Sequence, residues 1–164
     1  MSSHDVDLLG TPVVNEQPGF EISGVAGEDM SARQFCIVKA AGWDSATGGL
    51  VVVHTGAGEK PIGILQNDPA LGEAANIMCE GKSIIRLGAA VALQDSWVSD
   101  ANGFAVPMHA STGYDNLMEW VGGQFLGAFT LSSTVTGCEM GMVLVECKNP
   151  WHNLYGTAHV RGAQ

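Results

Sequence analysis

The sequence predicts a mainly β fold: a small barrel or sandwich of about nine to ten short strands, with two similar halves and an extended N-terminal arm. First, 22 glycines and six prolines lie without a strict period in 164 residues, which is typical of many tight turns and short strands. Second, 46% hydrophobic against 15% charged residues excludes a disordered chain and suits one domain with a real core. Third, a glycine-punctuated strand–turn–strand pattern occurs twice.

The repeated pattern covers residues 61–78 and again residues 125–145. Each copy is a short apolar strand around a glycine, then a polar turn, then a second strand, and the match aligns Gly63 with Gly127. The likeness extends backwards to two strand–turn–strand segments, 34–53 and 95–108. We therefore expect two equivalent halves built around shared apolar faces, with chance repetition in a glycine-rich chain as the alternative.

The apolar runs between the turns are the expected strands. Asn102-Gly103 between two of them predicts a hairpin, and the turn 80–82 is expected to reverse the chain between two others. A short helical turn is expected only around 114–120. The predicted strands are 35–39, 49–54, 61–66, 74–78, 83–87, 89–93, 96–98, 104–107, 124–131 and 140–147.

Charge divides the chain into three parts. Residues 1–30 contain six acids and no Lys or Arg, whereas the tail contains two basic residues and no acid. Because prolines and little periodicity mark the start, it is read as an extended arm rather than a helix. The expected parts are an acidic arm 1–23, a β domain 24–147 and a tail 148–164.

The composition argues against several classes of partner. A net charge of −10 with seven scattered basic residues is unlike a nucleic-acid or anionic-membrane binder. The chain contains no apolar run of 18 residues, so no membrane span is expected. The acidic start lacks the features of a secretory signal. The sequence therefore predicts no nucleic-acid and no membrane partner.

No arrangement of residues predicts catalysis, a metal or a cofactor. The five histidines form no metal-binding spacing, no GxSxG occurs, and residues 56–61 lack the GxxxxGK[ST] of a phosphate loop. The four cysteines form no CxxC and are expected as small buried hydrophobes of a reducing compartment, with a Cys138–Cys147 disulfide as the alternative. We expect a chain that is not an enzyme and needs no cofactor.

Aromatic and charged residues outside the core supply the candidate partner contacts. Trp97 is expected in the core, whereas the other three tryptophans flank loops or follow a proline. Exposed aromatic rings stack on sugars or anchor protein interfaces, and partial burial under loops is the alternative. The candidate contact residues are Asp5, Asp7, Trp43, Trp120, Trp151, Tyr155 and Arg161.

Glycine and apolar positions also follow a distinctive order along residues 24–147, at 35–38, 50–53, 62–65, 72–77, 84–91, 99–103, 126–129 and in the closing strand. In this order the chain resembles the head decoration, or capsid cement, proteins of tailed bacteriophages. It departs from the shorter members in its acidic arm, in an insertion near 111–123 and in its aromatic tail.

The resemblance implies a β-tulip-like fold and a structural role. It implies a homotrimer on the outer surface of the expanded phage head, made in the bacterial cytoplasm, that clamps adjacent subunits of the major capsid protein against the pressure of packaged DNA. The charge division adds the hypothesis that residues 1–30 meet residues 148–164 of a neighbour, or oppositely charged capsid proteins. The alternatives are a carbohydrate-binding β module displayed on the virion, which uses its tryptophans as platforms, and an enzyme with a Cys or His site.

Overall fold

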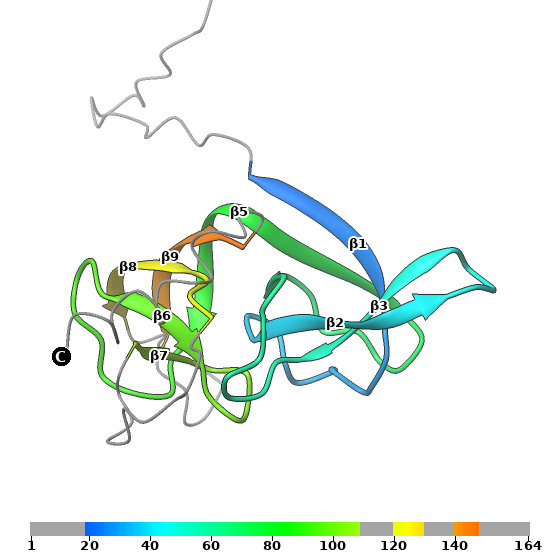
Figure 1. The fold of residues 1–164 in the computed structure, drawn as a ribbon, viewed down its shortest axis with the longest axis horizontal. Coiled ribbons are helices and arrows are strands. Elements are labelled where there is room, and N and C mark those ends of the chain that lie inside the picture. Colours follow the sequence, from blue (N-terminus) through cyan, green and yellow to red (C-terminus); the bar gives the residue numbers. More distant parts are fainter. Residues whose placement is uncertain (1–18, 109–119, 130–139, 148–164) are drawn as a thin grey trace, which may run out of the picture.

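The computed structural model describes residues 19–108, 120–129 and 140–147, and every regular element in these ranges is a strand (Figure 1). The prediction of a mainly β fold is confirmed. No helix in the described ranges is long and apolar enough to cross a membrane. The strands are β1 (Phe20–Ala26), β2 (Ile37–Asp44), β3 (Gly49–His54), β4 (Gly63–Leu65), β5 (Ala74–Arg86), β6 (Ser96–Ser99), β7 (Ala105–Pro107), β8 (Gly123–Phe129) and β9 (Met140–Glu146).

The first five strands close into a barrel. The order of pairing is β1-β3-β2-β4-β5, and β1 pairs with β5 to complete the ring. Only β1 and β3 run parallel; the other pairs are antiparallel. Apolar side chains that alternate along these strands fill the interior, among them Val38, Val52, Leu65 and Ile77.

Strand β5 is longer than the sequence predicts. Two strands joined by a turn at 80–82 were expected, and this is wrong, because β5 continues from Ala74 to Arg86. Gly81 has a φ of 117° and bends the strand without reversing it. Buried positions keep the same alternation on both sides of Gly81, from Ile77 to Ile85, so one strand serves two cores.

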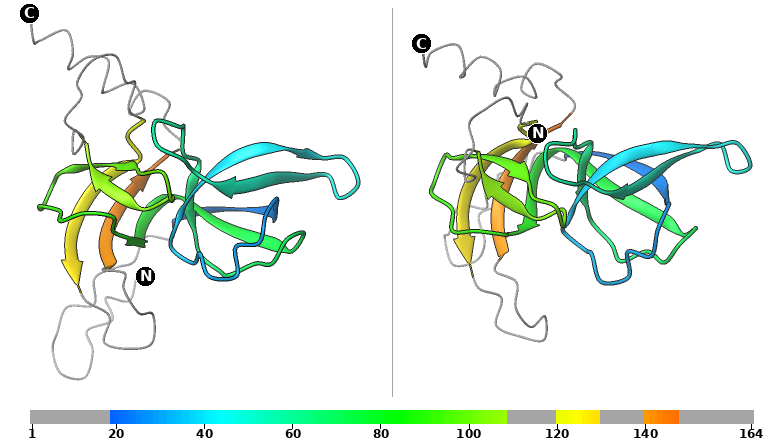
Figure 2. Two further views of the ribbon diagram at one scale, coloured as in Figure 1. Left: turned by 90° about the horizontal axis from the view of Figure 1, so that it is seen from below. Right: turned by 60° about the horizontal axis from the view of Figure 1, so that its bottom comes forward.

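The second half of β5 starts a second ring of strands. It pairs with β9, and the order continues through β8 and β6 to β7. A single parallel bridge between Leu87 and Ala105 closes this ring, one residue after β5 ends. Trp97 is fully buried in its core, as predicted, and its indole N–H donates to the Leu144 carbonyl at 3.1 Å. Figure 2 shows the two barrels side by side with β5 running through both.

The two barrels have the same connectivity. Each begins with a hairpin, β2–β3 or β6–β7, whose first strand pairs with the next strand, β4 or β8. That strand pairs in turn with β5 or β9. The wall supplied by β1 in the first barrel is supplied by the second half of β5 in the second barrel. The prediction of two similar halves is therefore confirmed.

Individual hydrogen bonds repeat between the barrels. The Phe35 N–H donates to the Leu65 carbonyl at 2.8 Å, and the Gln94 N–H donates to the Phe125 carbonyl at 2.9 Å. Among the described residues, Phe35 and Gln94 are the non-glycine residues with positive φ, at 67° and 70°. Likewise the Gly27 N–H donates to Val52 at 2.8 Å and the Gly88 N–H to Ala105 at 2.9 Å. An unusual backbone conformation at equivalent positions indicates one folding unit used twice.

The register of the repeat differs from the sequence alignment. Gly63 lies opposite Val38, and its equivalent opposite Trp97 is Gly123, not Gly127. The four-residue offset arises because β8 continues well past its pairing with β6, and a bulge between Phe125 and Gly127 gives it a second glycine.

Three further expectations meet the structure differently. Strand β1 begins at Phe20, within the segment expected as an arm, and was not predicted. Residues 89–93 form no strand, although one was expected there. The predicted helical turn falls mostly on residues 114–119, which lie outside the described ranges, and Trp120 is in neither helix nor strand.

Candidate partner-contact surfaces

A long hairpin projects from the first barrel. Strand β3 pairs with β1 at Val51 and Val52, and among the described strands the outer part of the β2–β3 hairpin is paired by its own ladder. It extends away from the body at the right of Figure 1 and of both views in Figure 2. Trp43 lies near its end, opposite Leu50, with 68% of its surface exposed. A large aromatic ring held in solvent this way is suited to bind a partner.

The tip of the hairpin is held by Asp44. The Gly48 N–H donates to the Asp44 carbonyl at 2.8 Å, and the Asp44 carboxylate accepts from the Ala46 N–H at 2.9 Å and the Thr47 hydroxyl at 2.6 Å. The bond from the Thr47 hydroxyl and that from the Ala46 N–H lower the pKa of the Asp44 carboxyl. These bonds fix the turn, so Trp43 is presented on an ordered support.

The outer edge of β2 is a second feature of the hairpin. On the side away from β3, strand pairing with β4 is limited to Ile37 and Val38 in the described part of the chain. The stretch from Lys39 to Asp44 therefore carries backbone groups that no described strand pairs. An open edge of this kind can accept a strand from another chain.

Trp120 occupies a different environment. It is partly buried ahead of β8, and the Lys60 ammonium lies 5.2 Å from the centre of its ring. This cation–π contact occupies one face of the indole. Trp120 is therefore less free than Trp43 to bind a partner.

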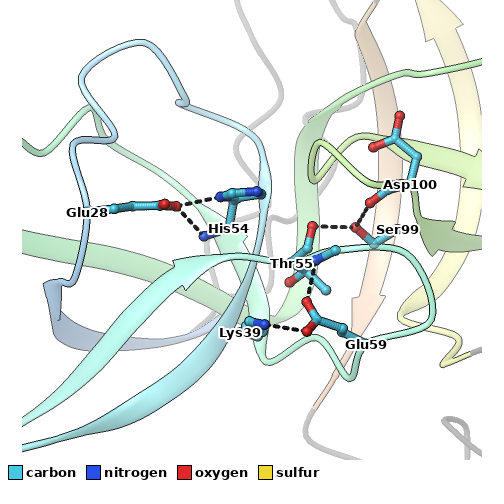
Figure 3. A network of polar contacts seen from close by, with 8 residues as sticks. Glu28, Lys39, His54, Thr55, Glu59, Ser99 and Asp100 are labelled. Atoms are coloured by element: carbon cyan, nitrogen blue, oxygen red, sulfur yellow. Dashed lines mark hydrogen bonds and ion pairs between the residues drawn. The ribbon is translucent and has the colours of Figure 1, made fainter.

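A network of polar side chains lies where the two barrels meet (Figure 3). Glu28 accepts from the His54 backbone N–H at 2.8 Å, and its carboxylate lies 2.6 Å from His54 Nδ1. Burial acts to raise the pKa of Glu28, but the bonds from His54 and the charges of His54 and Arg33 outweigh it, so the pKa lies below its ordinary value. His54 is therefore half-buried and paired with Glu28, and is not a solvated loop side chain.

The network continues toward the second barrel. Glu59 forms an ion pair with Lys39 and accepts from the Gly56 N–H at 2.6 Å. The Ser99 hydroxyl, from β6, donates to the Thr55 carbonyl at 3.1 Å. The Glu59 contacts lie within the first barrel, and the bond from Ser99 to Thr55 joins β6 to the segment that follows β3.

The described thiols are buried in the cores. Cys36, Cys79 and Cys147 are buried, as expected for small hydrophobes. Burial, with the nearby Glu21 charge, raises the pKa of Cys79 to about 11, and burial also raises the pKa of Cys147. Thiols with raised pKa are poor nucleophiles at neutral pH. In the described ranges no group of three or more His, Cys, Asp or Glu side chains could hold a metal ion.

The structure describes two of the seven candidate contact residues, Trp43 and Trp120, and places them in the contrasting environments above. The other five, like Cys138 and the alternative disulfide, fall outside the described residues: Asp5, Asp7, Trp151, Tyr155 and Arg161.

Sequence reasoning missed several exposed leucines. Leu93 is 67% exposed in the turn before β6, and Leu126 is 40% exposed on β8. Alternation along β8 carries the signal for Leu126, because its neighbour Phe125 points into the core. Leu93 gives no such signal, because it ends the apolar run 89–93 that the sequence predicted as a strand.

The comparisons with known proteins bear on the fold. No protein-family model and no curated protein matches this sequence. Among solved structures, the chain is similar to the N base of the head fiber protein gp8.5 of bacteriophage phi29, with a TM-score of 0.53 and 11% sequence identity. The match covers 78% of this chain and 94% of that chain. At this identity the likeness establishes a shared fold.

Proposed function

We propose that this chain is a structural protein of a phage virion, a decoration or cement protein on the outer surface of the expanded head. It binds the major capsid protein and clamps adjacent subunits against the pressure of packaged DNA. The observation that carries the proposal is the fold shared with the base of a phage head fiber, over 94% of that chain. The resemblance in glycine and apolar order along residues 24–147 supports the same role independently.

The projecting hairpin supplies a contact element for such a role. Trp43 is exposed on a turn fixed by Asp44, and tryptophans are over-represented among the residues that dominate binding energy. The open edge of β2 beside it can extend a sheet of a capsid protein. Both features belong to the first barrel and have no counterpart on the shorter β6–β7 hairpin.

A clamp gains strength from several weak contacts made at once. A trimer that engages several capsid subunits raises the effective concentration of each further contact. The acidic residues 1–30 and the basic residues 148–164 would add contacts between neighbours of opposite charge. The protein would be made in the host cytoplasm and assembled there on the head.

A non-enzymatic role agrees with the chemistry of the described residues. Cys79 and Cys147 have raised pKa values, and His54 is engaged by Glu28. Each of these groups has a structural part in a core or in the contact between the barrels.

Binding to capsids tests the proposal. The purified chain is mixed with expanded empty heads, and the heads are examined by cryo-electron microscopy and co-sedimentation. We expect density on the outer surface and at least a tenfold loss of affinity for Trp43→Ala. Leu71→Ala is the matched control, because Leu71 is equally exposed at 67% but lies on a different turn.

Two results would contradict the proposal: heads without added density, or density on the inner surface. Removal of residues 1–18 tests the arm separately, and unchanged capsid affinity after this deletion would contradict the arm hypothesis alone.

The exposure of Trp43 also favours the alternative, a carbohydrate-binding module on the virion. A glycan array and quenching of tryptophan fluorescence by host polysaccharides distinguish the two. Saturable quenching that Trp43→Ala abolishes, in a chain that does not bind heads, would replace the decoration role with sugar binding.

A further inference from the structure

Two buried thiols lie opposite each other where β5 meets the end of β9. The Cys147 N–H donates to the Cys79 carbonyl at 3.1 Å. The adjacent residues, Glu80 and Glu146, are the first pair of the β5–β9 ladder. Cys79 and Cys147 therefore extend this ladder by one pair, and directly opposed residues carry their side chains on the same face of a sheet.

The backbone at this pair is already spaced for a disulfide. Opposed residues that share such a backbone hydrogen bond have Cα atoms about 5.5 Å apart. Cysteines joined by a disulfide most often have Cα atoms about 5.5–6 Å apart. A bond between Cys79 and Cys147 therefore requires no large movement of either strand.

The two sulfur atoms are at present turned toward different carbonyls. The Cys79 thiol donates to the Ile77 carbonyl at 3.9 Å, and the Cys147 thiol donates to the Gly122 carbonyl at 3.7 Å. A thiol is a weak donor, so little is lost when these bonds break. Rotation about χ1 to another staggered position is the movement that brings the sulfurs together.

The position of the pair makes such a bond a link between the two barrels. Cys79 belongs to the core cluster of the first barrel, and Cys147 belongs to that of the second. Strand β5 bends at Gly81, two residues after Cys79, where it passes from one barrel to the other. A bond here would join the cores at the bend and fix the end of β9.

We propose that Cys79 and Cys147 form an oxidation site, which a small neutral peroxide converts into a disulfide that joins β5 to the end of β9. The sulfur of one thiolate attacks the O–O bond of hydrogen peroxide, which gives a sulfenic acid and releases one water. The sulfur of the second cysteine displaces hydroxide from the sulfenic acid, which forms the S–S bond and releases a second water. The two thiols lose two electrons, and the peroxide gains them.

Burial and charge select the oxidant. Cys79 is 5% exposed and Cys147 is 7% exposed, so a large reagent has poor access. Burial and the Glu21 charge raise the pKa of Cys79 to about 11, and burial, Cys79 and the Glu146 charge raise the pKa of Cys147. The nearby carboxylates disfavour an anionic oxidant such as glutathione disulfide. Since few thiolates exist at neutral pH, the reaction is slow there and faster in alkali.

The bond is expected outside the host cell. Thiols of this kind stay reduced in a bacterial cytoplasm and oxidise in the medium outside it. This timing rests on the proposed virion role, whereas the bond itself does not, because it forms within one isolated chain.

Peptide mapping of the oxidised chain tests the site. The full chain is incubated with hydrogen peroxide at about pH 9, alkylated and digested without reduction. We expect a linked peptide that joins Cys79 to Cys147, and a melting temperature raised by about 5 °C or more, because the bond closes a long loop. Dithiothreitol should reverse both changes. Glutathione disulfide at the same concentration should react at least tenfold more slowly.

Matched variants assign the effect to this pair. Cys147→Ala and Cys79→Ala should each abolish the linked peptide and the rise in melting temperature. Cys36→Ala, at a thiol that is also buried, should retain both. Three results would overturn the proposal: no such peptide from a wild-type chain that stays folded by circular dichroism, a bond from Cys147 to Cys138 instead, or a linked chain with no gain in melting temperature.

Discussion

The two barrels share a folding unit but differ in how they close. In the first, β1 forms a ladder with β5 from Phe20 to Val25 and also pairs with β3. In the second, the equivalent wall is the end of β5, and one bridge from Leu87 to Ala105 completes the ring. The first barrel therefore has a strand of its own to close it, whereas the second depends on a strand that the first barrel holds in place.

Trp97→Ala has the largest expected effect and tests this dependence. Removal of a fully buried tryptophan should cost about 3–5 kcal/mol. Hydrogen exchange should show lost protection in β6–β9 and retained protection in β1–β4, because the first ring closes without the second. Val38→Ala, at the equivalent position of the first barrel, should reduce protection in both barrels. Equal loss of protection across the molecule in both variants would show that the second barrel depends on the first no more than the first depends on the second.

Gly103→Ala has the next largest effect and tests the contact between the barrels. Gly103 has a φ of 78°, and an added Cβ would lie 3.0 Å from the Ile37 carbonyl oxygen of the first barrel. Strain and crowding together should cost about 2–3 kcal/mol in urea unfolding. Gly48→Ala, at a φ of 68° with open space around it, carries the backbone strain alone, about 1 kcal/mol. Equal losses of stability in the two variants would mean that crowding of the added Cβ against the Ile37 carbonyl contributes nothing.

Part of the pH dependence of stability should come from Glu28. The second barrel has no counterpart of the pair that Glu28 forms with His54, because Ala89 and Pro107 occupy the equivalent positions. The pKa of Glu28 lies below its ordinary value of 4.5 in the folded chain, so the native state favours the carboxylate. Its contribution is present above pH 4.5 and is lost as the pH falls through the folded pKa.

Since Glu28 is partly exposed, this effect should be about 1 kcal/mol or less. Urea unfolding between pH 3 and 7 should give a flatter profile for Glu28→Gln than for the wild type. Parallel profiles would exclude Glu28 as a source of the pH dependence.

Thr55→Val has the smallest expected effect. The Thr55 hydroxyl is buried and has no hydrogen-bond partner among the described residues, and the equivalent position in the second barrel is Met108. Replacement by an apolar group of similar shape removes this cost, so stability should rise by about 1 kcal/mol or less. Thermal unfolding measures the change, and a lower melting temperature would mean that the hydroxyl stabilises the native state.

Local signals in the sequence predicted part of the fold accurately. Glycines bound the β-branched run 49–54, and β3 has those ends. Asn102-Gly103 predicted the β6–β7 hairpin, which forms with Gly103 at positive φ. These elements are set by residues next to one another, so a sequence pattern contains the information.

Features that depend on distant partners were not predictable in the same way. Strand β1 alternates Ile22 with polar neighbours, but its partners in β3 and β5 are far along the chain, and its acidic context suggested an arm. The exposure of Trp43 agrees with its choice as a contact residue. The equivalence of Gly63 with Gly123 required the strand register of the structure, because the sequence alignment placed the repeat four residues away.

The sharing of β5 also imposes an order on biosynthesis. When the ribosome has released residues up to Arg86, the strands needed for the first ring are present, but Ser83–Arg86 still lacks its partner. That edge stays open until Met140–Glu146 has been translated, and open edges in nascent chains favour aggregation. Slow translation between these points would therefore lower the yield of folded protein, and chaperone demand should peak over this interval.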